Sequence, residues 1–206
     1  MTINRRQLLT TASFAALAAA SASAFAQDAP LSPIEWTDKN GLVKDLQKDA
    51  EPRKDELTKY PRCRYCGMER AKYSHTRMLI AYENGTAEGT CSLHCAAISL
   101  ALNMDAGTKE MYVGDAGAEG DIKPLTDAEK AHYVIDPSKP GVMTKVSKLA
   151  FADRAKAEAV ASAEASAKAG AKVVDFDAAL KDAYLGMAED TIMLRKRRTE
   201  IRKKKA

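Results

Sequence analysis

The four cysteines of this 206-residue chain lie in one stretch of the sequence, together with two of its three histidines. The stretch begins with Cys63-Arg64-Tyr65-Cys66-Gly67-Met68 and ends with Cys91-Ser92-Leu93-His94-Cys95. Thiolate and thioether donors favour Cu(I), zinc and the iron of iron–sulfur clusters over hard, oxygen-seeking cations. A metal site is therefore the leading hypothesis, and its candidate ligands are Cys63, Cys66, Met68, Cys91, His94, Cys95 and, further along the chain, Met143.

The spacing of the cysteines indicates how they could reach one ion. Cys63 and Cys66 lie on one predicted loop, and Gly67 permits the tight backbone that turns Cys66 inward. Cys91 ends a predicted strand, and Cys95 lies in the first turn of a predicted helix, whose positive N-terminal end stabilises thiolates. A hairpin between the two pairs would bring them together.

Methionine and histidine side chains offer the other soft donors. Met68 follows the first cysteine pair directly and is expected to be a thioether ligand. Met143 lies in a Pro-Gly loop of the second half, where a ligand that reaches across and a packing methionine fit equally well. His94 fits a ligand and an exposed helix residue equally, whereas His75 and His132 are expected to be structural or solvent-facing.

Four interpretations of the cysteines compete. A subset of the sulfurs could bind Cu(I) transiently, or all four could bind structural Zn(II). Two disulfides are the ordinary outcome for four cysteines in an oxidising compartment. A thioredoxin-type redox pair is the weakest interpretation, because no βαβ unit flanks Cys63 and Cys66 in the required way. The spacing of the cysteines alone favours a metal site over disulfides, but it does not distinguish a copper site from a zinc site.

The elements that position these residues are expected to follow the order strand, strand, helix, strand twice. Asn84-Gly85 predicts a hairpin turn in the first unit, and Ser92 is placed to cap its helix. The first unit is expected at 76–81, 87–91, 92–104 and 110–113, and the second at 131–135, 144–150, 152–168 and 172–174, with a terminal helix at 177–196. The predicted fold class is α+β, with two consecutive ββαβ units plus a C-terminal helix.

The beginning of the chain resembles an export signal. Arg5-Arg6 precede an apolar, alanine-rich run over residues 8–20, and Ala24-Phe25-Ala26 offers a small-x-small cleavage site. Paired arginines of this kind indicate twin-arginine export. We expect cleavage near Ala26, a periplasmic location, and no lipid anchor at the cleavage site, because no cysteine follows it.

These patterns together predict five segments along the chain. They are a signal peptide at 1–26, an extended N-terminal arm at 27–60, a ββαβ metal-binding unit at 61–115, a second ββαβ unit at 116–176, and a C-terminal helix with a basic tail at 177–206.

The positive charge of the chain is concentrated at its C-terminal end. The net charge is +4, but residues 195–206 contain eight basic residues and one glutamate, a balance of +7. Without this tail and the two leader arginines, 22 basic residues face 27 acidic ones, so the body carries about −5. The tail is therefore expected to be a solvated helix end or a peripheral contact with anionic lipid or an acidic partner, and no nucleic-acid partner is expected.

The motifs together resemble a known family. Cys-x-x-Cys-Gly-Met, the Asn84-Gly85-Thr86 hairpin and the Cys91–Cys95 motif are similar to the NosL family of nitrous-oxide-reductase accessory proteins. The resemblance covers about residues 61–185 and includes the downstream segments His132-Tyr133-Val134, Pro140-Gly141-Val142-Met143 and Asp175-Phe176-Asp177. The Cys-Gly-Met and Cys-x-x-x-Cys motifs also resemble the smaller TRASH and YHS metal-binding modules.

The resemblance implies a function as well as a fold of two ββαβ units. It implies a periplasmic Cu(I) chaperone without catalytic activity, which receives copper from an upstream donor and serves assembly of the copper centres of nitrous oxide reductase. Cys91 and Cys95 do not occur throughout the family, so they are expected either to add ligands or to form a metal-relay pair. The alternatives are a structural zinc-binding interaction module and a thiol–disulfide redox protein.

Overall fold

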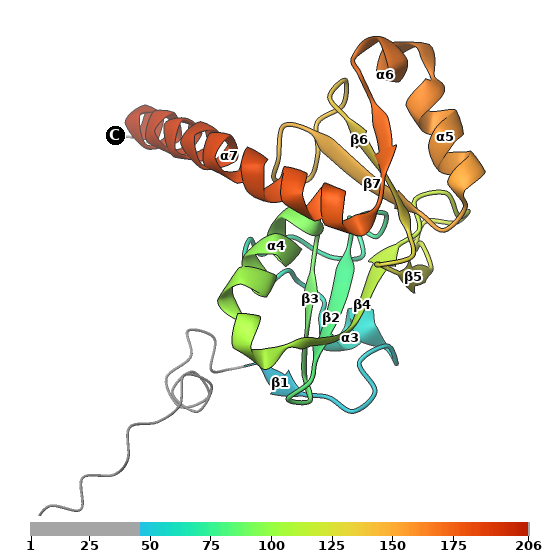
Figure 1. The fold of residues 1–206 in the computed structure, drawn as a ribbon. Helices are drawn as coiled ribbons and strands as arrows, with labels where there is room; N and C mark the ends of the chain where they lie inside the picture. The colour runs from blue at the N-terminus through green and yellow to red at the C-terminus, as the bar shows by residue number, and fades with distance from the viewer. Residues whose placement is uncertain (1–45, 206) are drawn as a thin grey trace, which may run out of the picture. The chain divides into compact units, whose positions relative to one another are not determined.

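Two antiparallel sheets organise the part of the chain that the computed structural model describes, residues 46–205 (Figure 1). In the larger sheet the strand order is β1 (Gln47–Lys48), β3 (Thr86–Thr90), β2 (Met78–Tyr82), β4 (Thr108–Gly114) and β5 (Leu125–Asp127). In the smaller sheet it is β7 (Ser147–Phe151), β6 (His132–Asp136) and β8 (Lys172–Val174). These sheets are accompanied by helices α4 (Leu93–Leu102), α5 (Arg154–Ser162), α6 (Glu164–Lys168) and α7 (Phe176–Lys205), so the predicted α+β class is confirmed. Strands β2 and β3, helix α4 and strand β4 form one ββαβ unit, and β6, β7, α5 with α6, and β8 form the second.

The first unit is built on a strand that is buried on both faces. β2 (Met78–Tyr82) lies between β3 (Thr86–Thr90) and β4 (Thr108–Gly114), and all five of its residues are buried. A strand covered on both faces is a continuous apolar run without alternation. The predicted turn between β2 and β3 is present, with Gly85 at φ 80°. Antiparallel pairing then sets Met78 opposite Thr90, directly before the second cysteine pair.

Two short strands complete the larger sheet, one at each edge. β1 (Gln47–Lys48) pairs with β3, and β5 (Leu125–Asp127) pairs with β4.

The second unit is centred on β6 (His132–Asp136), which pairs with β7 (Ser147–Phe151) and β8 (Lys172–Val174). Side chains that alternate along β6 enter different apolar clusters. Tyr133 joins the main core, whereas Val134 joins a smaller cluster with residues of α5. Both faces of this central strand are therefore covered.

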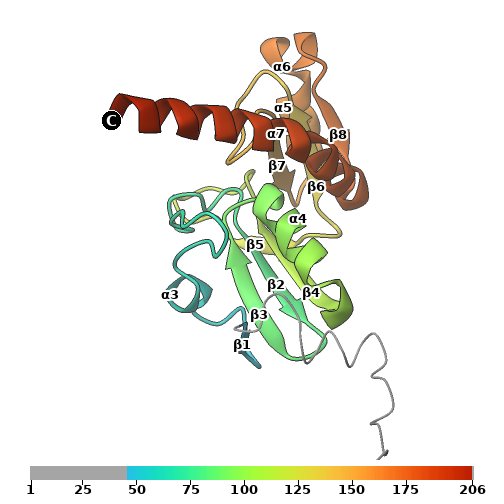
Figure 2. The same ribbon diagram turned by 90° about the vertical axis from the view of Figure 1, so that its left-hand side faces the viewer.

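One apolar core joins the two units. It contains side chains of β2, β4, α4 (Leu93–Leu102), β6, β7 and α7 (Phe176–Lys205). Figures 1 and 2 show α7 passing close to both α4 and the second sheet. Among the described residues, no helix is both long and apolar enough to cross a membrane.

The helix expected over 152–168 is divided in two. α5 (Arg154–Ser162) and α6 (Glu164–Lys168) are separated by Ala163, whose ψ of 138° is extended. The Ser162 hydroxyl donates to the carbonyl of Glu158 at 2.8 Å, a local bond that competes with the helical pattern. The prediction of one continuous helix was wrong at this point.

Two other boundaries differ from the prediction. β7 begins at Ser147 and not near Thr144, because the chain first makes a turn in which the amide of Gly141 donates to the carbonyl of Thr144 at 3.0 Å. α7 continues past 196 to Lys205. Its last turns carry many basic residues, which the negative end of the helix dipole stabilises.

Residues 46–60, the described part of the predicted arm, contain β1 and the one-turn helix α3 (Glu56–Lys59). Glu56 is buried and forms ion pairs with Arg70 and Arg77, each at 2.7 Å. This part of the arm is therefore bound to the body by charge.

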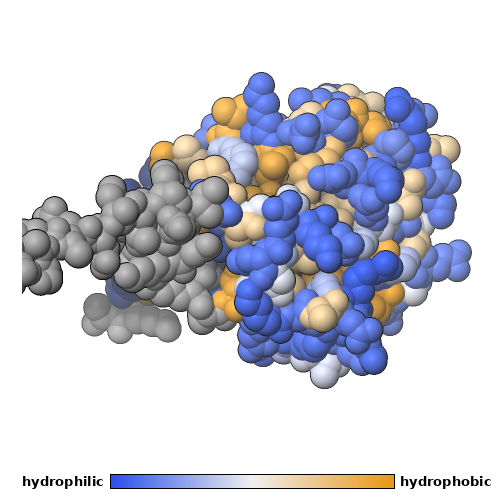
Figure 3. Space-filling model, turned by 60° about the horizontal axis from the view of Figure 1, so that its bottom comes forward, coloured by the Kyte–Doolittle hydropathy of each residue, from blue (hydrophilic) through white to orange (hydrophobic). Residues whose placement is uncertain are grey.

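Hydrophilic residues predominate on the face that Figure 3 shows. The predicted signal peptide and the rest of the arm lie outside the described residues.

Candidate metal centre

A tight loop presents the first cysteine pair. The amide of Cys63 donates to the carbonyl of Met68, and the amide of Gly67 donates to the carbonyl of Cys63, each at 2.8 Å. Gly67 has φ 77°, a left-handed conformation that only glycine adopts at little cost. Arg62 and Glu69 close the base of the loop with an ion pair of 2.8 Å. The loop geometry therefore follows from the Cys-x-x-Cys-Gly-Met motif itself.

The second pair lies where β3 passes into α4. Cys91 follows the last residue of β3, and Cys95 lies in the first turn of α4. Ser92 has extended backbone angles and occupies the N-cap position, as predicted, but its hydroxyl does not cap the helix. The hydroxyl donates instead to the carbonyl of Val142 at 3.2 Å. The Thr76 hydroxyl donates to the carbonyl of Cys91 at 2.7 Å and fixes the start of this turn.

The four cysteine sulfurs converge on one point. The Sγ atoms of Cys63, Cys66, Cys91 and Cys95 all lie within 4.8 Å of one another. The Sγ of Cys91 is 3.4 Å from that of Cys66 and 3.8 Å from that of Cys95. Four thiolates arranged tetrahedrally at a metal–sulfur distance of about 2.3 Å lie about 3.8 Å apart. The four sulfurs could therefore hold one metal ion.

Burial of the four sulfurs is uneven. Cys63, Cys91 and Cys95 are at most 2 % exposed, whereas Cys66 is partly exposed. An ion that enters the cluster therefore has its shortest route past Cys66.

The thiols influence one another's ionisation. Hydrogen bonds with the other three thiols hold the pKa of Cys63 below its ordinary value. The pKa of Cys66 is lowered as well. Its hydrogen bond with Cys63 raises this pKa, but the hydrogen bonds with Cys91 and Cys95 lower it by more. Hydrogen bonds with Cys63 and Cys66 raise the pKa of both Cys91 and Cys95. Negative charge is thus concentrated at the first pair, and a bound cation would displace protons from the second.

Two methionines lie at the edge of the cluster. Met68 and Met143 are partly buried and pack against the cysteines. Met143 has φ 65°, a conformation that a residue with a side chain adopts only when its surroundings hold it there. The structure therefore brings together six of the seven proposed ligand residues.

The seventh, His94, has a different environment. Its Nδ1 atom lies 3.5 Å from the Oδ2 atom of Asp190 on α7. His94 is buried, and burial lowers the pKa of its imidazole. In the described part of the chain, the group of mutually close ligand atoms consists of the four sulfurs and does not include His94. His75 is partly buried, and its pKa is lowered by burial as well.

Several contacts of the site were not identified from the sequence. Tyr65, Tyr73 and Val142 pack against the cluster. The hydroxyl of Tyr65 donates to the Oε1 atom of the buried Glu88 at 3.2 Å, which ties the loop to β3. The position of Tyr65 between Cys63 and Cys66 in the sequence could have predicted this packing. The sequence gives no such signal for Tyr73 and Val142, because only the tertiary fold brings them close to the cysteines.

These features define an α+β protein with a four-cysteine, metal-competent centre. The sequence profile of NosL matches residues 54–184, so the chain belongs to the NosL family and the resemblance seen in the sequence is confirmed.

Among solved structures, the chain is similar to the crystal structure of the copper chaperone NosL from Shewanella denitrificans. The two are 24 % identical, the match covers 56 % of this chain and 87 % of that one, and the TM-score is 0.44. A search of curated proteins found no match.

Proposed function

We propose that this protein is a Cu(I) metallochaperone. The observation that carries the proposal is the convergence of four cysteine sulfurs within 4.8 Å, with two methionines packed at the edge. Thiolate and thioether donors are the ligands that Cu(I) prefers. A chaperone must also release its ion, and the partly exposed Cys66 and Met68 give a partner's ligands access for exchange. This role requires no catalytic group.

The location and partners of the chaperone are part of the same proposal. Export by the predicted twin-arginine signal would place it in the periplasm. Membership of the NosL family supports a role in copper-enzyme assembly, with nitrous oxide reductase as the acceptor and an upstream copper donor. The basic end of α7 would provide a peripheral contact with an anionic membrane.

A structural zinc module is the second candidate, because a specific observation favours it. The distances of 3.4 and 3.8 Å between neighbouring sulfurs are close to the separation of about 3.8 Å around a tetrahedral zinc ion. Three of the four cysteines are buried, as is usual for a closed structural site. The two functions differ in whether the site accepts Cu(I) in competition and gives it up again.

Anaerobic titration of the reduced mature protein with Cu(I) against a competing chelator tests the proposal. We expect the protein to bind one Cu(I) tightly. Cys66→Ser should weaken this affinity at least tenfold, because a tenfold change corresponds to only about 1.4 kcal/mol of binding free energy, a modest loss for a metal–thiolate bond. Met68→Ala should weaken binding as well. Met104→Ala is the matched control, because Met104 is 77 % exposed in the short helix Met104–Ala106 and should leave the affinity unchanged.

Metal and thiol analysis of the protein as isolated separates the alternatives. Stoichiometric zinc that Cu(I) does not replace would show a structural zinc module and end the copper proposal. Four free thiols after denaturation would exclude the two-disulfide interpretation.

A further inference from the structure

The loop between β6 and β7 brings Met143 to the cysteine cluster. Met143 is partly buried, packs against the cysteines and has a left-handed backbone. A non-glycine residue keeps such a conformation only where its surroundings over-determine it. The contacts on each side of Met143 therefore decide whether its thioether stays at the cluster.

On the N-terminal side, the loop is fixed to the metal centre itself. The Ser92 hydroxyl donates to the carbonyl of Val142 at 3.2 Å, and Ser92 is the residue after Cys91. The amide of Gly141 donates to the carbonyl of Thr144 at 3.0 Å, which closes the turn around Met143.

On the C-terminal side, the loop is fixed to α7. The Oδ1 atom of Asp190 accepts a hydrogen bond from the amide of Lys145 at 3.1 Å. Asp190 is 2 % exposed, and its Oδ2 atom lies 3.5 Å from the Nδ1 atom of His94, one residue before Cys95. One buried carboxylate thus contacts both the Met143 loop and the helix that carries Cys95.

We infer that Asp190 is a positioning residue, which holds Met143 against the cysteine cluster and makes α7 part of the metal centre. The NosL match ends at residue 184, so this contact comes from the part of α7 that lies beyond it. The inference rests on the proposed function for its consequence: Met143 keeps the bound ion from escaping. The positioning itself is a property of the protein without metal and can be measured there.

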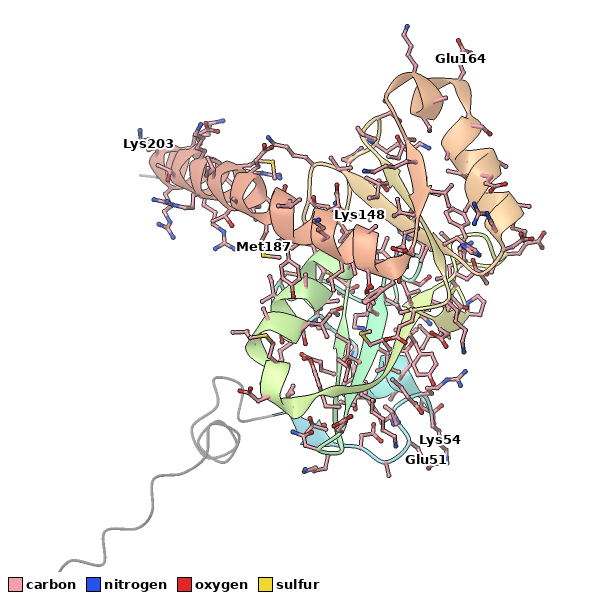
Figure 4. The ribbon with its side chains drawn as sticks, viewed as in Figure 1. Glu51, Lys54, Lys148, Glu164, Met187 and Lys203 are labelled. Atoms are coloured by element: carbon pink, nitrogen blue, oxygen red, sulfur yellow. The ribbon has the colours of Figure 1, made fainter. Side chains whose placement is uncertain are left out.

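The rest of α7 has attachments of its own, so an Asp190 variant is expected to fold. Tyr184 donates to the carbonyl of Ala97 at 2.8 Å, and Lys148 forms an ion pair with Asp182 at 3.0 Å. Met187 extends from α7 on the side toward α4 and packs against the main core (Figure 4).

The first test is the rate at which iodoacetamide alkylates each thiol of the reduced, metal-free protein, read by mass spectrometry. Asp190→Ala should raise the rates at the buried Cys63, Cys91 and Cys95 about fivefold relative to the partly exposed Cys66, which is an internal reference. A fivefold change corresponds to about 1 kcal/mol, within the range of measured interaction energies. Asp190→Asn keeps an oxygen acceptor for the Lys145 amide and should remain close to the wild type.

The matched control is Glu189→Gln, which removes a neighbouring carboxylate of α7. Glu189 is 75 % exposed and forms an ion pair with the Lys145 side chain at 3.6 Å, so this variant should keep wild-type alkylation rates. A double-mutant cycle with Met143→Ala identifies the route of the effect. If Asp190 acts through Met143, Asp190→Ala should add nothing in the Met143→Ala background.

Copper release supplies the second readout. Asp190→Ala should speed the transfer of Cu(I) to a chelator about fivefold, and this gain should also vanish with Met143→Ala. The inference is overturned if Asp190→Ala lowers the melting temperature but leaves the alkylation rates unchanged, or if its effect and that of Met143→Ala are additive. If the variants show the expected coupling in the alkylation rates but the wild-type protein binds no Cu(I), the chaperone function is refuted and the positioning role of Asp190 stands.

Discussion

Glu56 shows how a single buried residue supports the cysteine cluster from outside it. Its carboxylate forms ion pairs with Arg70 and Arg77. Arg70 is fully buried and donates to the carbonyls of Tyr60, shortly before the first cysteine pair, and Thr90, immediately before the second. The guanidinium therefore ties together the two segments that present the cysteines.

Glu56→Gln is expected to lower the free energy of unfolding by about 3 kcal/mol. The loss arises because two buried guanidinium groups are left without their counter-charge, which is more costly than the loss of an exposed pair. Urea unfolding of the reduced, metal-free protein measures it.

Glu51→Gln is the control for this prediction. Glu51 and Lys54 are 74 % and 70 % exposed at the side-chain level and 3.9 Å apart (Figure 4), so their pair should contribute less than 1 kcal/mol. Equal losses in the two variants would mean that burial of the Glu56 pairs has no energetic consequence.

At the scale of elements, Asp136 joins the second sheet to its helices. It ends β6, is 2 % exposed, and accepts hydrogen bonds from the Ser166 hydroxyl of α6 at 2.8 Å and the Ser138 amide at 2.9 Å. Lys139 forms an ion pair with it at 3.0 Å. Burial raises the pKa of this carboxyl, but the hydrogen bonds from Ser138, Ser166 and Lys139 outweigh burial and hold the pKa well below its usual range.

Asp136→Asn should therefore reduce stability in a pH-dependent way. A folded-state pKa below the unfolded value of about 3.9 means that the carboxylate stabilises the fold above that pH. The contribution begins to decline as the pH falls below about 3.9 and is fully lost only below the folded-state pKa. At pH 7 we expect a loss of about 2 kcal/mol, typical of hydrogen bonds to a charged group.

The measurement is denaturant unfolding of both proteins between pH 7 and pH 3, where the difference between them should shrink at the acidic end. Asp105→Asn, at an exposed position, should show no such difference at any pH. A gap between Asp136→Asn and the wild type that is the same at both ends of the range would contradict a role for the carboxylate charge.

At the scale of the whole molecule, the C-terminal end of α7 is strongly basic, whereas the rest of the chain is acidic. Residues 195–206 contribute +7 to a net charge of +4, so a chain without them would carry −3. The helix continues to Lys205, and residues 195–204 are exposed; Figure 4 shows Lys203 near the end of α7. Anionic lipid would attract this segment and repel the acidic body.

Deletion of residues 195–206 should abolish binding to vesicles that contain phosphatidylglycerol, as followed by co-sedimentation at low and high salt. Each basic residue near an anionic surface contributes about 1 kcal/mol, so loss of eight should weaken binding far more than tenfold. Melting temperature should not change, because the deleted side chains that are described lie in solvent.

Vesicles of phosphatidylcholine alone are the control and should bind neither protein. If the full-length protein does not bind anionic vesicles, or if the shortened one binds equally well, the membrane contact is refuted and the basic segment is a solvated helix end.

Residues close together in the sequence determined the first cysteine loop, the hairpin and the two ββαβ units. Gly67 and the Cys-x-x-Cys spacing determine the first loop, Asn84-Gly85 determines the hairpin, and the apolar patterns predicted both ββαβ units. These features depend on residues close together in the chain, where backbone preference and periodicity act directly. The candidate cysteine cluster followed from them, because the hairpin returns the chain to its starting point.

Only the tertiary structure decided how the cluster is enclosed. Met143 reaches it from a loop 48 residues beyond Cys95, and Asp190 fixes that loop from another 47 residues further on. No local pattern marks such contacts, because they form only when the packing of α7 against α4 and the second sheet buries them together. The contact of His94 with Asp190 has the same origin: His94 is next to Cys95 in the sequence, but the buried carboxylate that it contacts belongs to a distant helix.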